Sequence, residues 1–148
     1  MQNIIFDWTG VIKDGLEDHL KIVNLMFEDF GLAPLSLEDL KETWKQPYMD
    51  FYKTHLPSLT MQQQKKAYFR AFFQIPKGKP YSGMVDLVKK LSSDGKKLVI
   101  LSSDSPRSIL GEIKDFGLEG FFEDMDLEVH DKVEHIAELM DRNSMKLE

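Results

Sequence analysis

Three side chains that could act together chemically each follow a stretch typical of a β-strand. They are the carboxylate of Asp7, the hydroxyl of Ser102 and the ammonium group of Lys132. The carboxyl ends of parallel strands meet at one edge of an α/β sheet, so we expect these groups to lie close together. A carboxylate can attack phosphorus, a hydroxyl can hold a phosphoryl oxygen, and a lysine can offset negative charge. The combination indicates phosphoryl transfer through an aspartyl phosphate.

Each of these residues also has a plain structural interpretation. An Asp at the end of a strand is commonly a turn former or the N-cap of the next helix. Ser102 and Ser103, after a strand, are ordinary loop residues. Lys132 stands where a helix is expected to begin, a position that the helix dipole disfavours for a cation, and either a nearby anion or exposure to water would compensate. Both interpretations stay open from these residues alone.

The second half of the chain alternates between segments with the periodicity of strands and helices. Residues 98–101 are apolar at every position, which is typical of a parallel strand covered by helices on both faces. The expected strands are 4–6, 98–101 and 125–129, and the expected helices are 83–92, 106–116 (with Ser105 as N-cap) and 133–141. The pattern predicts an α/β fold, a Rossmann-like parallel sheet core with helices on both faces.

Residues 16–75 carry no strand pattern and predict an all-helical insert after the first strand. Ser36 and Thr60 each begin a capping box, which marks the start of a helix. The expected helices of the insert are 16–30, 37–45, 48–56 and 61–73. We therefore expect this region to form a domain of its own.

The stretch 76–82, with Lys and Gly between two prolines, predicts a connector from the insert back to the main body. A chain of 148 residues can bury one core of useful size. The expected domains are an α/β core of residues 1–15 and 78–148 and a helical domain of residues 16–77.

Composition excludes several classes of protein. The net charge of −6 and a pI near 5.2 give no basic surface for nucleic acid. The absence of cysteine excludes disulfides, thiolate chemistry and the usual structural zinc sites. No signal peptide and no membrane-spanning segment is recognisable. We expect a cytoplasmic protein that binds neither nucleic acid nor membrane.

Three ordered motifs resemble those of the haloacid dehalogenase superfamily. They are FDWTGV at 6–11, PYSGMVDLVKKLSSDGKKLVILSSDS at 80–105 and FGLEGFFEDMDLEVHDKVEHI at 116–136, with the helical insert after the first of them. The resemblance spans essentially the whole chain. It implies a hydrolase with a helical cap of the C1 type, residues 16–77, which closes over the substrate and sets specificity.

The resemblance also implies roles for individual residues. Asp7 would be the nucleophile and a magnesium ligand, and the backbone carbonyl of Thr9 would bind the same ion. Ser102 would contact the phosphoryl group and Lys132 would stabilise it. Further phosphate-binding positions would be Trp8, Gly10 and Ser103. The substrate would be a small phosphorylated metabolite.

The first departure from the family pattern is Thr9. Phosphatases of the superfamily usually carry a second aspartate there as general acid and base, and a hydroxyl without a proton sink should slow both steps by about 10²-fold or more. Thr is familiar at this position in P-type ATPases. The sequence Asp7 to Gly10 also resembles that of phosphonoacetaldehyde hydrolases, in which a cap lysine forms a Schiff base. Candidate lysines for that alternative are Lys41, Lys45 and Lys53.

The second departure is the acidic fourth motif, which the sequence lacks after Lys132. Asp141 cannot replace it because Asp141 falls inside the last expected helix. Magnesium prefers an octahedral shell of oxygen ligands, so we expect it to bind weakly or not at all. The strand that would carry this motif would pair beside residues 3–6, which we expect to be an exposed sheet edge open to self-association or completion by a partner. The alternative function is a non-catalytic fragment or interaction module.

Overall fold

The computed structural model describes residues 3–45 and 48–146. Clustering of contacts divides the chain into two compact units. The sheet unit consists of residues 1–14 and 78–148, and the helical unit consists of residues 15–77.

A parallel sheet organises the sheet unit. Within the described residues it has the order β1-β4-β5, formed by β1 (Asn3–Phe6), β4 (Lys97–Leu101) and β5 (Asp124–Asp126). Ile4 pairs with Leu98, and Leu101 pairs with Asp126. The first two strands confirm the prediction. The strand ends thus point the same way and bring the loops that follow them to one edge.

The third strand differs from its predicted range of 125–129. It ends at Asp126 because the chain then bends away, with Glu128 in the left-handed region at φ 60°. The amide of Glu128 donates to the carbonyl of Asp104 at 2.9 Å, and the amide of Val129 donates to the carbonyl of Ser102 at 3.0 Å. Residues 128 and 129 therefore bind the loop after β4 instead of extending the sheet.

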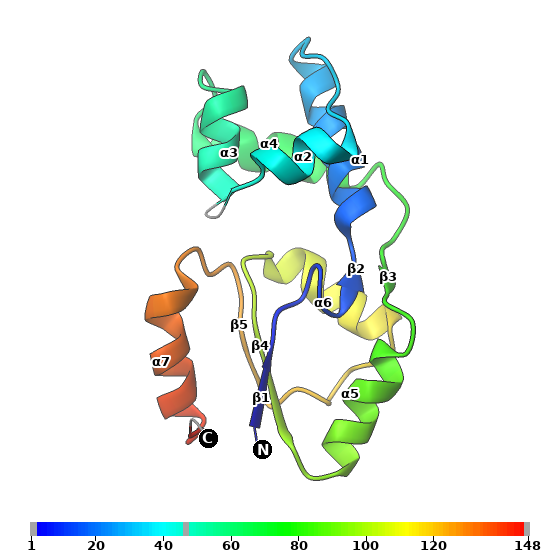
Figure 1. Ribbon diagram of the computed structural model, residues 1–148, viewed down its shortest axis with the longest axis vertical. Coiled ribbons are helices and arrows are strands. Elements are labelled where there is room, and N and C mark those ends of the chain that lie inside the picture. Colours follow the sequence, from blue (N-terminus) through cyan, green and yellow to red (C-terminus); the bar gives the residue numbers. More distant parts are fainter. Residues whose placement is uncertain (1–2, 46–47, 147–148) are drawn as a thin grey trace. The chain divides into compact units, whose positions relative to one another are not determined.

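Helices cover both faces of the sheet (Figure 1). Leu98 and Ile100 of β4 belong to the cluster that contains α5 (Met84–Ser93) and α6 (Pro106–Asp115). The residues between them, Val99 and Leu101, belong to the cluster of α7 (Lys132–Arg142). This alternation confirms the α/β, Rossmann-like fold class. Ser105 precedes α6 as predicted, but within the described chain its side chain makes no capping hydrogen bond and instead lies 3.3 Å from the hydroxyl of Ser108.

A second, two-stranded sheet was not predicted. It pairs β2 (Lys13–Asp14) with β3 (Lys79–Pro80) in antiparallel orientation, and the amide of Tyr81 donates to the carbonyl of Ile12 at 2.9 Å. The helical region therefore leaves the sheet unit after β2 and not directly after the first strand. Its two connections to the sheet unit are hydrogen-bonded to each other.

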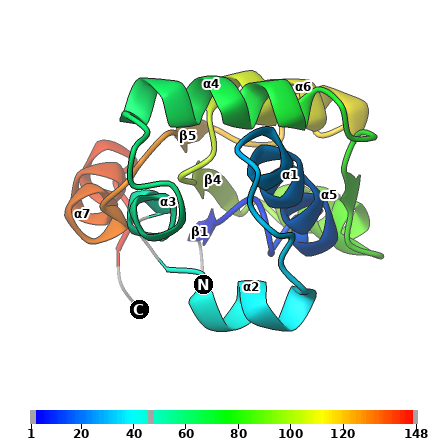
Figure 2. The same ribbon diagram turned by 90° about the horizontal axis from the view of Figure 1, so that it is seen from above.

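The helical unit contains α1 (Leu16–Asp29), α2 (Leu37–Thr43), α3 (Tyr48–His55) and α4 (Met61–Phe72). Both predicted capping boxes are present, at Ser36 and at Thr60. In Figure 2, α1 and α3 lie between α2 and α4. Phe27, Phe51 and Leu40 are among the buried residues of this unit, so it has a hydrophobic core of its own.

Two further expectations concern surfaces. Within the described residues β1 lies at one end of the strand order, as predicted for an edge strand, and self-association through it stays a prediction. No helix in the described part of the chain is long and apolar enough to cross a membrane.

Candidate active site

A tight loop after β1 positions Asp7. The carbonyl of Trp8 accepts hydrogen bonds from the amides of Val11, Ile12 and Lys13 at 3.2, 2.9 and 3.0 Å. Gly10 supplies the turn at φ +89°, a conformation that residues with a side chain rarely adopt. The amide of Trp8 donates to Oδ1 of Asp7 at 2.8 Å. The loop thus folds around the residue next to Asp7 and restrains the orientation of its carboxylate.

Lys132 reaches the same carboxylate from the start of α7. Its Nζ lies 2.6 Å from Oδ2 of Asp7, and the two side chains are 35% and 40% exposed. Asp131 caps α7, since its carboxylate accepts from the amides of Val133 and Glu134 at 3.0 and 3.3 Å. Asp7 is the nearby anion that can compensate for a cation at this helix start. Two of the three predicted reacting groups are therefore in direct contact and accessible to a ligand.

The hydroxyl of Ser102 is engaged by a residue that the sequence analysis missed. Asp104 accepts hydrogen bonds at Oδ2 from Ser102 at 3.1 Å and from Thr9 at 2.7 Å. The amide of Asp104 also donates to the Ser102 hydroxyl at 3.1 Å, and Ser102 is fully buried. Ser102 must therefore break its bond to Asp104 before it can donate to a phosphoryl oxygen. The sequence feature that could have pointed to Asp104 is its position two residues after Ser102, in the same loop after a strand.

The side chain of Trp8 lies in the core, so only its main chain can take part in the predicted phosphate binding. Its indole is 0% exposed, stacks on Phe116 at a centroid distance of 5.7 Å, and donates from Nε1 to Glu112 at 2.7 Å. The side chain points into the core because the large apolar ring gains more from burial than from a polar loop. Gly10 is exposed and Ser103 is partly buried, both in the loops that follow the strand ends.

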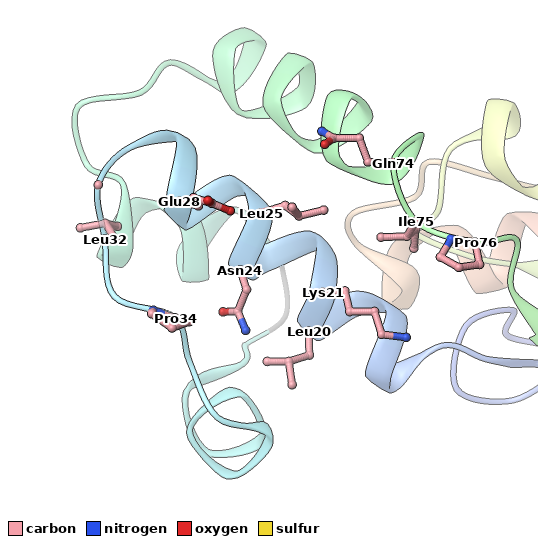
Figure 3. Close-up of a pocket in the computed structure, with 11 residues that line it drawn as sticks. Leu20, Lys21, Asn24, Leu25, Glu28, Leu32, Pro34, Gln74, Ile75 and Pro76 are labelled. Atoms are coloured by element: carbon pink, nitrogen blue, oxygen red, sulfur yellow. The ribbon is translucent and has the colours of Figure 1, made fainter.

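The helical unit has a groove of about 830 Å³ on its surface (Figure 3). It runs along α1 between residues 31–34 and residues 74–76. The side chain of Asn24 in its wall is already bound to the main chain of Leu35. Its Nδ2 donates to the Leu35 carbonyl at 3.0 Å, and its Oδ1 accepts from the Leu35 amide at 2.8 Å. Leu20, Leu25 and Ile75 make much of the remaining lining apolar. The groove contains none of the predicted reacting residues.

The three lysines considered for Schiff-base chemistry are exposed on the helical unit taken by itself. Lys53 forms only a 3.5 Å pair with Asp50 one turn earlier, and its side chain is 70% exposed. Lys41 and Lys45 are exposed as well. A lysine nucleophile of this kind is activated by burial in an apolar pocket or by a neighbouring cation. Within the described residues of the helical unit, none of these three lysines has a buried environment.

Comparison with known proteins decides the family. The model of the haloacid dehalogenase-like hydrolase family matches residues 4–146. The chain belongs to this family. A curated relative, a phosphoglycolate phosphatase of Synechococcus elongatus, is 29% identical over 126 residues, which are 82% of this chain and 58% of that protein. The chain thus spans less than two thirds of the length of this relative.

Solved structures with the same fold include other haloacid dehalogenase-like proteins. A haloacid dehalogenase-like hydrolase of Streptococcus pneumoniae is 18% identical with a TM-score of 0.74, and the match covers 100% of this chain and 72% of that one. A protein of Clostridium acetobutylicum described as a predicted phosphatase is 20% identical with a TM-score of 0.78, over 98% and 71% of the two chains. At these identities the likeness establishes the fold.

Haloacid dehalogenase-like phosphatases generally use Mg²⁺, and the donors among residues 3–45 and 48–146 do not complete such a site. Oδ2 of Asp7 is bound by Lys132 and Oδ1 by the amide of Trp8. Among the described residues no group of three or more acidic or histidine side chains is arranged to hold a metal ion. One carboxylate and one carbonyl fall short of the oxygen shell that Mg²⁺ prefers.

Proposed function

We propose that this chain is a phosphohydrolase that acts on a small phosphorylated metabolite through an aspartyl phosphate at Asp7. The observation that carries the proposal is the 2.6 Å contact between Nζ of Lys132 and Oδ2 of Asp7. It lies where the segments that follow β1 and β5, the two strands on either side of β4, come together. A carboxylate with an accessible cation beside it can approach a phosphoryl group whose negative charge would otherwise repel it.

The first step transfers the phosphoryl group to Asp7. A carboxylate oxygen of Asp7 forms a bond to phosphorus, and the bond from phosphorus to the leaving-group oxygen breaks with its electron pair on that oxygen. Lys132 offsets the charge on the phosphoryl oxygens. The hydroxyl of Thr9 already donates its proton to Asp104 at 2.7 Å, so it is a poor acid for the leaving group. This step should therefore be slow for substrates that release a basic alkoxide.

The second step hydrolyses the aspartyl phosphate. A water molecule forms a bond to phosphorus, the bond to Asp7 breaks and returns its carboxylate, and the proton of the water passes to a base. We assign this base to Asp104, whose carboxylate lies within hydrogen-bond distance of the position-9 side chain. Asp104 thereby supplies the proton sink that Thr9 itself lacks. The hydroxyl of Thr9 can hold the water or pass its proton on.

The helical unit would act as the cap that sets specificity. It is inserted between β2 and β3, so both of its connections leave the unit that contains Asp7. The printed name of the Synechococcus elongatus relative makes phosphoglycolate the first substrate to test. Magnesium would bind this chain weakly. The protein would act in the cytoplasm.

The test measures hydrolysis of phosphoglycolate and of p-nitrophenyl phosphate by the chain, with added Mg²⁺. Asp7→Asn should abolish turnover, because the amide is a far weaker nucleophile than the carboxylate. The matched control is Asp86→Asn, which removes an exposed carboxylate on α5. Acid-quenched wild-type protein should carry one phosphoryl group on the peptide that contains Asp7. Turnover that survives Asp7→Asn would overturn the proposal. Absence of both turnover and phosphoenzyme would favour the non-catalytic interaction module.

A further inference from the structure

A buried carboxylate on α6 holds two groups of the loop that carries Asp7. Oε2 of Glu112 accepts from the indole Nε1 of Trp8 at 2.7 Å, and Oε1 accepts from Nζ of Lys13 at 2.5 Å. Glu112 is 7% exposed, Lys13 is 6% exposed and Trp8 is 0% exposed. The two ends of the loop after β1 are therefore bound by one side chain, out of contact with solvent.

Trp8 is held from several sides. Its ring stacks on Phe116 with an interplanar angle of 12° and meets Phe122 edge-on at a centroid distance of 6.4 Å. These contacts orient the ring, and the hydrogen bond to Glu112 adds a directional restraint at its N–H edge. The main chain of Trp8 in turn bonds Oδ1 of Asp7 and accepts the three loop amides. A shift of the indole would therefore be transmitted to Asp7.

Lys13 connects the same carboxylate to the strands that lead to the helical unit. It is the first residue of β2, where it pairs with Pro80 of β3. Its side chain crosses directly over Gly78, where an added Cβ would lie 2.5 Å from Cε of Lys13. The side chain of Lys13 can thus reach Glu112 only because residue 78, where the chain re-enters the sheet unit, is a glycine. Glu112 therefore joins the Asp7 loop to β2, which in turn pairs with β3.

Stability alone is a weak explanation for a buried ion pair. Desolvation of both charges offsets most of their attraction, and well-packed apolar residues of similar volume often give equal or greater stability. What an apolar replacement cannot provide is a directional acceptor for the indole N–H. We propose that Glu112 is a positioning residue, which holds the Trp8 indole and thereby sets the Asp7 carboxylate for attack on phosphorus. This role rests on the proposed phosphohydrolase function.

The deciding variant is the double substitution Glu112→Leu with Lys13→Met, which removes both charges together and keeps similar volumes. We expect it to fold with a melting temperature at or moderately below that of the wild type, because loss of the buried ion pair is close to neutral whereas the indole N–H is left without an acceptor. We expect kcat for p-nitrophenyl phosphate to fall about tenfold, with KM within about twofold, because a misplaced nucleophile slows the chemical step more than it weakens binding. Glu112→Gln with Lys13→Met keeps an acceptor for the indole and should retain kcat within about twofold.

A readout independent of activity separates failure of this inference from failure of the proposed function. The chain has two tryptophans, so Trp44→Phe assigns the two indole N–H signals in a nitrogen-15 NMR spectrum. In the Leu/Met variant the Trp8 indole signal and the amide signals of residues 7–10 should shift, whereas in the Gln/Met variant, which shares the substitution at position 13, these signals should resemble those of the wild type. If the Leu/Met variant does not fold, Trp8→Phe replaces it, since it keeps the ring stacking and removes the N–H donor.

The control pair is Lys90→Met with Asp94→Leu, at an exposed ion pair on α5 that should affect neither readout. An unchanged kcat in an active Leu/Met variant overturns the positioning role. Unchanged amide signals for residues 7–10 overturn it even if the wild type proves inactive. A wild type without turnover whose loop signals shift as expected overturns the proposed function and leaves the loop-holding role of Glu112 supported.

Discussion

The hydroxyl of Thr9 lies 2.7 Å from Oδ2 of Asp104, although 95 positions separate the two residues in the chain. Phosphatases of this family usually carry a carboxylate in place of Thr9. Here a carboxylate from the loop after β4 reaches the hydroxyl instead, and it also accepts from Ser102 at 3.1 Å. The carboxylate is therefore close to the site but enters it from a different strand end. Its effect on each chemical step can be separated by experiment.

Asp104→Asn should slow hydrolysis of the aspartyl phosphate, because the amide cannot accept the proton of the attacking water. We expect kcat for p-nitrophenyl phosphate to fall by about 10²-fold. The phosphoenzyme should accumulate, so rapid mixing should reveal a burst of p-nitrophenol near one equivalent per chain. Asp115→Asn, which alters a carboxylate at the end of α6, is the control. A variant with unchanged kcat and no burst would show that Asp104 is not the base.

The leaving group should control the first step more strongly than in a phosphatase with an aspartate at position 9. Without a strong acid beside the leaving oxygen, negative charge must develop on it in the transition state. Across a series of aryl phosphates, kcat/KM should fall steeply as the pKa of the free phenol rises. Thr9→Asp supplies the missing carboxyl group and should flatten this slope. A slope that is already flat in the wild type would contradict the proposed role of Thr9.

The parts of the fold that the sequence predicted are those encoded by local patterns. The apolar run of β4 and the capping boxes at Ser36 and Thr60 each lie within a few neighbouring residues. The pairing of β2 with β3 was missed because each strand has two residues and the partners, such as Lys13 and Pro80, are far apart in sequence. Strand pairs of that length have no periodicity to detect.

The same distinction applies to the candidate site. Asp7 and Lys132 could be selected because each stands near a strand end, and the structure brings them into contact. Asp104 could not be paired with Thr9 without coordinates, since that contact is made between separate loops. The sequence gives one indication that Glu112 is buried. It stands three positions after Ile109, a spacing that places both residues on the buried face of α6. The burial of the Trp8 side chain could not be foreseen, because sequence position alone does not tell whether a side chain in a loop points to the site or to the core.

Gly78→Ala should destabilise the sheet unit. The new Cβ would lie 2.5 Å from Cε of Lys13, and the buried bond to Glu112 prevents the lysine from moving aside cheaply. We expect a loss of about 1–3 kcal/mol in the free energy of unfolding, measured by urea denaturation. Gly111→Ala is the matched control, since its Cβ would meet nothing within 4 Å inside α6 and should stabilise the protein by about 0.5–1 kcal/mol. Equal effects of the two substitutions would show that Lys13 is not held in place.

The tie between β5 and the end of α7 should give stability that disappears in acid. Oδ2 of Asp124 accepts from Nε of Arg142 and from Nδ2 of Asn143, both at 2.7 Å. Burial would raise the pKa of Asp124, but these hydrogen bonds, with that from the amide of Met125, outweigh it and hold the pKa below its ordinary value. A carboxyl group with a lowered pKa in the folded state contributes stability above its unfolded pKa of about 3.9 and loses it as the pH falls through the folded value.

Asp124→Asn should therefore lower the melting temperature by about 1–3 °C at pH 7, the scale of a largely exposed charged pair. The difference between wild type and variant should persist down to about pH 5 and then shrink as the pH falls below about 4, because the wild-type carboxyl becomes neutral there as well. Asp86→Asn controls for the loss of one negative charge on the sheet unit. A difference that stays constant from pH 7 to pH 3 would mean that the ionised form of Asp124 does not stabilise the attachment of α7.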